Sequence, residues 1–167
     1  MQNFSLTPHF ELQEFTESAT ASSHGIDNVP PFEAVENLKF LCVFTLEPLR
    51  EALGMPIIIT SGYRSKALND RITHHSSTSQ HMNGEAADFY VGWNSPKEKA
   101  PLRRELLIKA FRQIITDDSI VFDQCIIYPS FIHVSYVRNG KNRSKLTRGF
   151  GNGKYAALTR AQALALI

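Results

Sequence analysis

One stretch organises this chain: Ser79-Gln80-His81-Met82-Asn83-Gly84-Glu85-Ala86-Ala87-Asp88, which sets an imidazole and a carboxylate seven positions apart. The serines before it are typical of a loop, whereas the apolar run 86–91 predicts a buried strand. His81 is therefore expected on the loop and Asp88 on the strand, with Gly84 allowing a tight turn between them. Both side chains can bind zinc. Taken alone, however, a loop histidine such as His81 is usually solvated, and a single strand aspartate such as Asp88 often caps a neighbouring turn.

A third ligand is expected at His133, where an imidazole interrupts the strand-like run Phe131-Ile132-His133-Val134-Ser135-Tyr136. Taken by itself, His133 is more typical of a hydrogen-bonded, half-buried histidine. Together, two histidines and one aspartate leave zinc a free fourth position. That arrangement is typical of a catalytic zinc site and not of a closed structural one.

These motifs resemble peptidase family M15, the zinc D-Ala-D-Ala carboxypeptidases and peptidoglycan endopeptidases, and most of all its carboxypeptidase branch. The resemblance covers about residues 57–136 and depends on three motifs in the family's order: Ser61-Gly62-Tyr63-Arg64-Ser65, Ser79-x-His81-x-x-Gly84-x-Ala86-x-Asp88, and His133 in its His-Val-Ser segment. It implies an α+β hedgehog/DD-peptidase fold, with an antiparallel sheet and flanking helices. It also implies that His81, Asp88 and His133 bind Zn²⁺, and that the substrate is the stem peptide of peptidoglycan.

Arg64 has two interpretations. It can form a surface ion pair with Asp70 or Glu85, or its planar guanidinium can bind a carboxylate of the wall peptide. Because the motif around Arg64 resembles the family's substrate-binding turn, we favour substrate binding, and we expect Ser79 and Gln124 to contact substrate as well.

The chain departs from the family's pattern at the position of the general base. Family members with a carboxylate base have a glutamate three residues before the last histidine, where this chain has Ser130. The carboxypeptidase branch has a histidine five residues before it, where this chain has Tyr128. A tyrosine, with an ordinary pKa of about 10, is a poor base but can donate to an oxyanion. We therefore predict catalytic roles for Tyr128 and Arg64; the alternative is a zinc-containing peptidoglycan-binding module with little or no turnover.

The last hairpin decides which side chains stand beside His133. Pro129 disfavours a two-residue loop, because primed turns need a positive φ that proline cannot adopt. A four-residue loop over residues 128–131 instead places Ile126 opposite His133. Strand alternation then puts Gln124 and Tyr128 on the metal side and Asp123 on the far side.

Elsewhere, sequence periodicity predicts helices. Pro30-Pro31 opens a long helix that Pro48 should kink or divide and Gly54 should end. A second amphipathic helix is expected over residues 100–115, after a polar loop at 93–99. The inward positions on the two helices are Phe32, Val35, Leu38, Leu41, Cys42, Leu46, Leu49 and Leu53, and Leu102, Leu106, Leu107, Ala110, Phe111 and Ile114. A capping box predicts a last helix beginning at Thr159.

Composition narrows the classes of protein further. The length of 167 residues is typical of a single domain, residues 1–167. The net charge is only +2, and positive and negative residues are mixed along the chain, so the sequence predicts no nucleic-acid-binding surface. Cys42 and Cys125 lie in apolar surroundings and predict no disulfide. No apolar run is long enough to cross a bilayer, and residues 1–7 lack the features of a secretory signal. We therefore expect a protein made in the cytoplasm that reaches the cell wall after release, as a phage or prophage lysis protein would.

Overall fold

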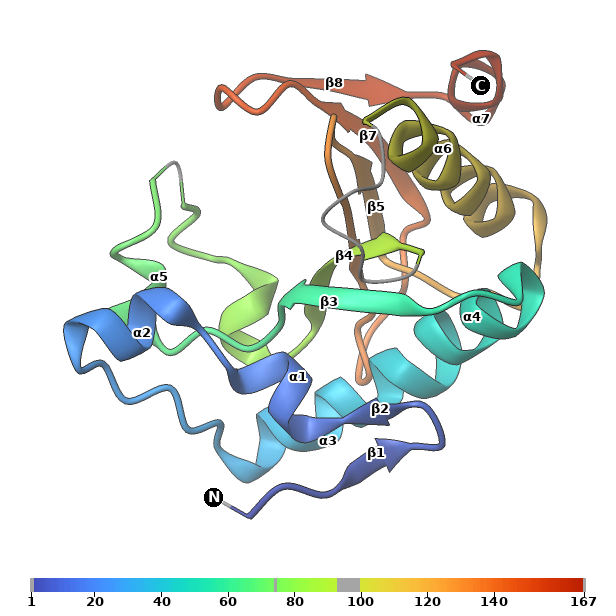
Figure 1. Ribbon diagram of the computed structural model, residues 1–167. Helices are drawn as coiled ribbons and strands as arrows, with labels where there is room; N and C mark the ends of the chain where they lie inside the picture. Colours follow the sequence, from blue (N-terminus) through green and yellow to red (C-terminus); the bar gives the residue numbers. More distant parts are fainter. Residues whose placement is uncertain (1, 74, 93–99, 167) are drawn as a thin grey trace.

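The computed structural model describes residues 2–73, 75–92 and 100–166 (Figure 1). Its central sheet has six strands, which run from edge to edge as β3 (Ile57–Ser61), β4 (Ala86–Val91), β6 (Ile132–Ser135), β5 (Gln124–Ile127), β7 (Lys145–Gly149) and β8 (Tyr155–Leu158). A separate small sheet pairs β1 (Ser5–Thr7) with β2 (Phe10–Glu11).

The predicted α+β class is confirmed, and the large sheet is antiparallel except where β5 and β7 run parallel. Both edges of β6 are occupied, by β4 and β5, so the next strand along the chain pairs with the free edge of β5. This arrangement brings the residues after 144 beside β5, which separates them from β6, the strand that carries His133.

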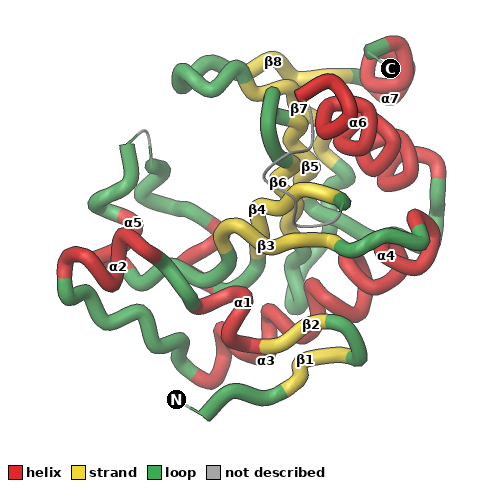
Figure 2. Tube along the Cα trace, viewed as in Figure 1, coloured by secondary structure: helices red, strands yellow, loops and turns green. Residues whose placement is uncertain are grey.

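The helices are α1 (Leu12–Thr16), α2 (Ala19–His24), α3 (Phe32–Leu41), α4 (Glu47–Leu53), α5 (Lys66–Asn69), α6 (Ala100–Thr116) and α7 (Arg160–Ala165). Helix α6 packs across β4 and β5 and against α4 (Figure 2). Along these strands, side chains alternate between the core and the opposite face of the sheet. Those buried in the core are Ala87, Phe89, Val91, Cys125, Ile132 and Val134. The opposite face is left for the site.

The predicted long helix is divided as expected. A π-helical turn, Cys42–Leu46, separates α3 from α4, and Pro48 lies in the first turn of α4. Proline has no N–H and crowds the carbonyl four residues earlier, so the wider π turn accommodates it. Gly54 ends α4 with φ of 62°, as a left-handed C-terminal residue.

The N-terminal segment supports the turn after β3. The amide of Tyr63 donates to the carbonyl of Phe15 at 2.7 Å, and a Cβ added to Gly62 would lie 2.5 Å from the Phe15 Cβ. Phe15 itself is fully buried. The Gly62 to Arg64 turn is therefore fixed against α1 by a contact that only glycine permits.

Two predicted inward positions are wrong. Phe32 is 80% exposed and Leu102 is 47% exposed. Each lies in the first turn of its helix, and the buried positions begin after it, at Ala34 in α3 and Leu107 in α6. The predicted loop 93–99 lies outside the described residues. Among the described helices, none combines the length and the apolar character needed to span a membrane.

Candidate metal centre

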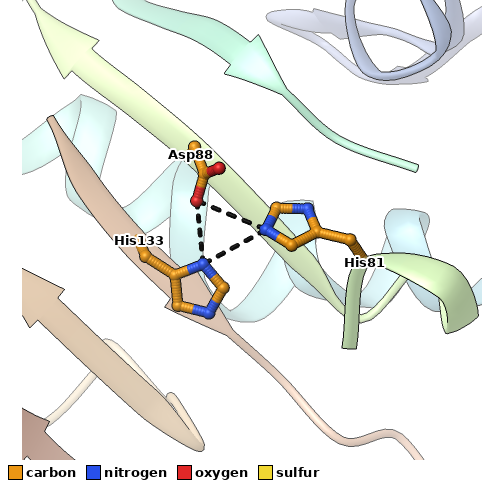
Figure 3. Close-up of side chains that lie close together, drawn as sticks. All are labelled: His81, Asp88 and His133. Atoms are coloured by element: carbon orange, nitrogen blue, oxygen red, sulfur yellow. Dashed lines mark hydrogen bonds and ion pairs between the residues drawn. The ribbon is translucent and has the colours of Figure 1, made fainter. Parts of the chain in front are cut away.

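Three predicted ligands from three segments converge on one point (Figure 3). Asp88 on β4 is paired directly with His133 on β6, and His81 lies in the short 3₁₀ turn Gln80–Asn83 that precedes β4. The His133 Nδ1 lies 2.8 Å from Asp88 Oδ1 and 3.2 Å from His81 Nε2. The His81 Nε2 to Asp88 Oδ1 distance is 3.3 Å. The atoms form a small triangle of electron-pair donors.

This triangle fits zinc. A tetrahedral zinc ion with bonds of about 2.0–2.1 Å keeps its ligand atoms about 3.3 Å apart. The surroundings also orient the ligands, because His81 Nδ1 lies 2.7 Å from the carbonyl oxygen of Gly62. A carbonyl can only accept, so Nδ1 carries the proton and Nε2 keeps its lone pair for the metal.

Arg64 completes the surroundings of Asp88. Its Nη2 donates to Asp88 Oδ2 at 2.7 Å, and its Nε donates to the Ser61 hydroxyl at 2.9 Å. Arg64 is therefore paired with the proposed ligand, and the surface ion pairs weighed from the sequence, with Asp70 or Glu85, are not the ones it makes. The guanidinium holds one carboxylate oxygen while the other faces the two imidazoles.

The electrostatics favour metal binding. Burial lowers the pKa of His81, so the imidazole is neutral and able to donate its lone pair. Burial alone would raise the pKa of Asp88. The electrostatic effect of the neighbouring His81 and the hydrogen bond from His133 outweigh it and hold that pKa well below its ordinary value. Asp88 is therefore a carboxylate at neutral pH.

The triangle lies in a cleft of about 700 Å³, which is large enough for a short peptide. Arg64, Ser79, Gln124 and Tyr128, for which the sequence predicts roles in substrate binding or catalysis, all line this cleft. The predicted hairpin register is confirmed, with Ile126 paired with His133 and Ile127 with Ile132. Residues that the sequence reasoning missed also line the cleft: His75, Lys145, Thr147, Gly151, Gly153 and Tyr155. Lys145, Thr147 and Tyr155 come from β7 and β8, and Gly151 and Gly153 come from the turn between them. No local pattern links these residues to the ligands.

Tyr128 lies in this cleft as a hydrogen-bond donor. Burial, and then the hydrogen bond to Tyr155, raise the pKa of its hydroxyl. The hydroxyl therefore stays protonated at neutral pH and cannot act as a base. Ser130, at the place of the family's glutamate, is exposed and is not among the described residues that line the cleft.

Asp123 is buried and bound from two sides. Arg143 donates to it from its side chain, at 2.7 Å through Nε, and from its backbone amide, while Gln80 Nε2 donates at 3.1 Å. Asp123 is not among the described residues that line the cleft with the three ligands. Since Gln80 precedes His81, this network ties the ligand loop to the end of the sheet. Arg143 was not identified from the sequence.

Replacing Arg143 with alanine is expected to lower the free energy of unfolding by about 2 kcal/mol at pH 7, because buried Asp123 loses a charged donor. Burial alone would raise the pKa of Asp123, but the bonds from Arg143 and Gln80 lower it. This stabilisation is therefore present above about pH 4 and is lost as the pH falls through the lowered pKa. Urea unfolding of both proteins at pH 7 and pH 3 measures it.

The matched control is Lys66→Ala, which breaks the exposed ion pair with Asp70 and should cause no measurable change. An Arg143→Ala effect of the same size at both pH values would contradict this role.

The comparisons with known proteins agree with the geometry. A family model described as Peptidase M15 matches residues 8–135, a range that holds all three ligands and Arg64. None of the curated proteins matches the chain. Strands β7 and β8 and helix α7 follow the matched range.

Proposed function

Since the chain belongs to peptidase family M15, we propose that it is a zinc peptidase that hydrolyses peptide bonds of peptidoglycan. The observation that carries the proposal is the triangle of His81, Asp88 and His133 in a cleft large enough for a peptide. Bound zinc would polarise the scissile carbonyl and lower the pKa of a water molecule. The open side of the triangle, towards the cleft, is where that water and the carbonyl would meet.

The remaining cleft residues would bind and orient the peptide. Arg64 and Lys145 give the cleft a cationic lining, and Asp88 is its only carboxylate among the residues that the structure describes. This charge suits the free carboxylates of a wall stem peptide. Tyr128 would donate its proton in a hydrogen bond to the carbonyl oxygen as negative charge develops there. Gln124 and Ser79 offer further polar contacts along the same cleft.

The specific bond is proposed as either the terminal D-Ala-D-Ala bond or a cross-link between stem peptides. We further propose that the protein acts at the cell wall after release from the cytoplasm, in the manner of a phage or prophage lysis protein. Muropeptides of defined cross-link, analysed by mass spectrometry after digestion, distinguish the two bonds.

Purified cell wall provides the direct test. We expect the zinc-loaded protein to release D-alanine or new amino groups, a chelator to stop the release, and added zinc to restore it. Hydrolysis that persists after the metal is removed would reject the proposed mechanism.

A second function is favoured by one observation, the lack of a carboxylate other than Asp88 among the described cleft residues. A protein without a general base could bind the wall through the metal and cleft without turnover. The test is whether the protein sediments together with purified cell wall. If it does, and the zinc-loaded form releases no amino groups, the result would support the binding module and reject the peptidase.

Replacing Arg64 with lysine is expected to raise KM for a wall peptide by about tenfold. Zinc affinity should fall by a smaller factor than this. Lysine keeps the charge but cannot bind Ser61 and Asp88 together or present a planar fork to a carboxylate. Steady-state kinetics and metal analysis measure the two effects separately. The control is Arg71→Lys, at an exposed arginine. An unchanged KM in Arg64→Lys would remove Arg64 from substrate binding.

A further inference from the structure

Tyr155 lines the metal cleft although it lies beyond residues 8–135, the range that matches the family model. It begins β8, the edge strand of the sheet, and its side chain is 53% exposed. The parallel pairing of β5 with β7, followed by the turn into β8, brings it there. Part of the wall of the cleft is therefore built by the C-terminal hairpin.

This hairpin fixes the Tyr128 ring. A Cβ added to Gly149 on β7 would lie 2.3 Å from Cε1 of Tyr128, so the ring occupies the space that a side chain there would fill. On another side, the Phe131 ring stacks on it with a centroid distance of 4.3 Å and an interplanar angle of 16°. Gly149 is paired directly with Tyr155 on β8. One cross-strand pair thus supplies both the space for the ring and the partner for its hydroxyl.

The Tyr128 hydroxyl donates to the Tyr155 hydroxyl oxygen, with an oxygen to oxygen distance of 3.2 Å. A tyrosine hydroxyl can both donate and accept, and it can rotate about its C–O bond. When Tyr155 instead donates to Tyr128, the pair is kept and the Tyr128 O–H is free to donate to a carbonyl oxygen in the cleft. Tyr128 lines the same cleft as the three ligands. Burial keeps the pKa of its hydroxyl above the ordinary value, so the hydroxyl is protonated at neutral pH.

We propose that Tyr155 is a positioning residue that holds the Tyr128 hydroxyl at the metal cleft, so that the pair donates one hydrogen bond to the carbonyl oxygen of the bound peptide. The proposal rests on the peptidase function above for its catalytic consequence. The positioning itself depends only on the contacts among Tyr128, Gly149 and Tyr155.

The kinetic test uses Tyr155→Phe, Tyr128→Phe and the double variant. We expect Tyr155→Phe to lower kcat about tenfold, the order expected for one neutral hydrogen bond, with KM changed less than about twofold. Zinc content and thermal stability should be unchanged. Because Tyr155 acts through Tyr128, the double variant should be no slower than Tyr128→Phe. Effects of the two substitutions that multiply would overturn the proposal.

A second measurement does not need activity. The protein has five tyrosines, so labelling with 3-fluorotyrosine gives a small set of fluorine NMR signals, and Tyr128→Phe identifies the signal of Tyr128. In Tyr155→Phe, this signal should titrate at a lower pH, because its hydroxyl loses the acceptor that helps to keep it protonated. Tyr136→Phe, which removes a hydroxyl outside the cleft lining, should leave it unchanged.

The two measurements separate the proposals. A protein without hydrolysis but with the expected shift of the Tyr128 signal would reject the peptidase function and retain the positioning. A Tyr128 signal that titrates identically in Tyr155→Phe and in the unmodified protein would overturn the positioning, whatever the activity.

Discussion

Replacing Asp88 with asparagine is expected to abolish zinc binding at micromolar concentration and to lower wall hydrolysis by about 10³-fold. The amide has nearly the volume of the carboxylate but lacks its charge, so the site keeps its shape and loses one of three ligands. A metal supplies several kcal/mol of charge stabilisation in the transition state, and about 4 kcal/mol corresponds to that factor. Metal analysis after dialysis and the amino-group assay measure the two losses.

The substitution also affects Arg64, whose Nη2 donates to Asp88 Oδ2. An amide oxygen can still accept this bond, so we expect the fold to survive, and circular dichroism checks it. The matched control is Asp70→Asn, which removes a half-exposed carboxylate at the C-terminal end of α5 that pairs with Lys66 and His75. If Asp88→Asn retained one zinc per chain at wild-type affinity, the metal would have to lie elsewhere.

The ligand set could be predicted because each ligand stands in a local pattern. Strand alternation predicts the face of the sheet on which His133 lies, and Pro129 predicts the length of the hairpin loop. Together they predict the pairing of Ile126 with His133, which the structure has. The same holds for Pro48 and Gly54, whose backbone constraints act within a few residues. These features depend on short-range sterics, which a single sequence carries directly.

The other parts of the site depend on pairings between distant segments. Arg143 binds Asp123 across twenty positions, and Tyr155 reaches Tyr128 across twenty-seven. Both contacts require the chain to leave β6, pass the end of the sheet and pair with β5 in parallel. Nothing local in the glycine- and charge-rich segment 138–154 specifies that choice, because it depends on which strand edge is free after β4, β5 and β6 have paired.

The ligand loop is held against α3 by a close contact at Gly84. Gly84 has φ of 70° and ends the 3₁₀ turn that carries His81. A Cβ there would lie 2.2 Å from the carbonyl oxygen of Ala34 in α3. Asn37 of α3 also donates to the carbonyl of Asn83 at 2.9 Å, so helix and loop are in direct contact. A side chain at Gly84 must therefore push the loop away from α3.

We expect Gly84→Ala to lower the free energy of unfolding by about 4 kcal/mol, combining about 1–2 kcal/mol of backbone strain with about 1–3 kcal/mol of overpacking. Gly54→Ala has the same strain at φ of 62° but open space around the new Cβ, and should cost only about 1 kcal/mol. Urea unfolding compares the two. Zinc affinity should fall in Gly84→Ala alone, because the displaced loop carries His81. Equal losses of stability in both variants would show that backbone strain, and not the contact with α3, sets the position of this ligand.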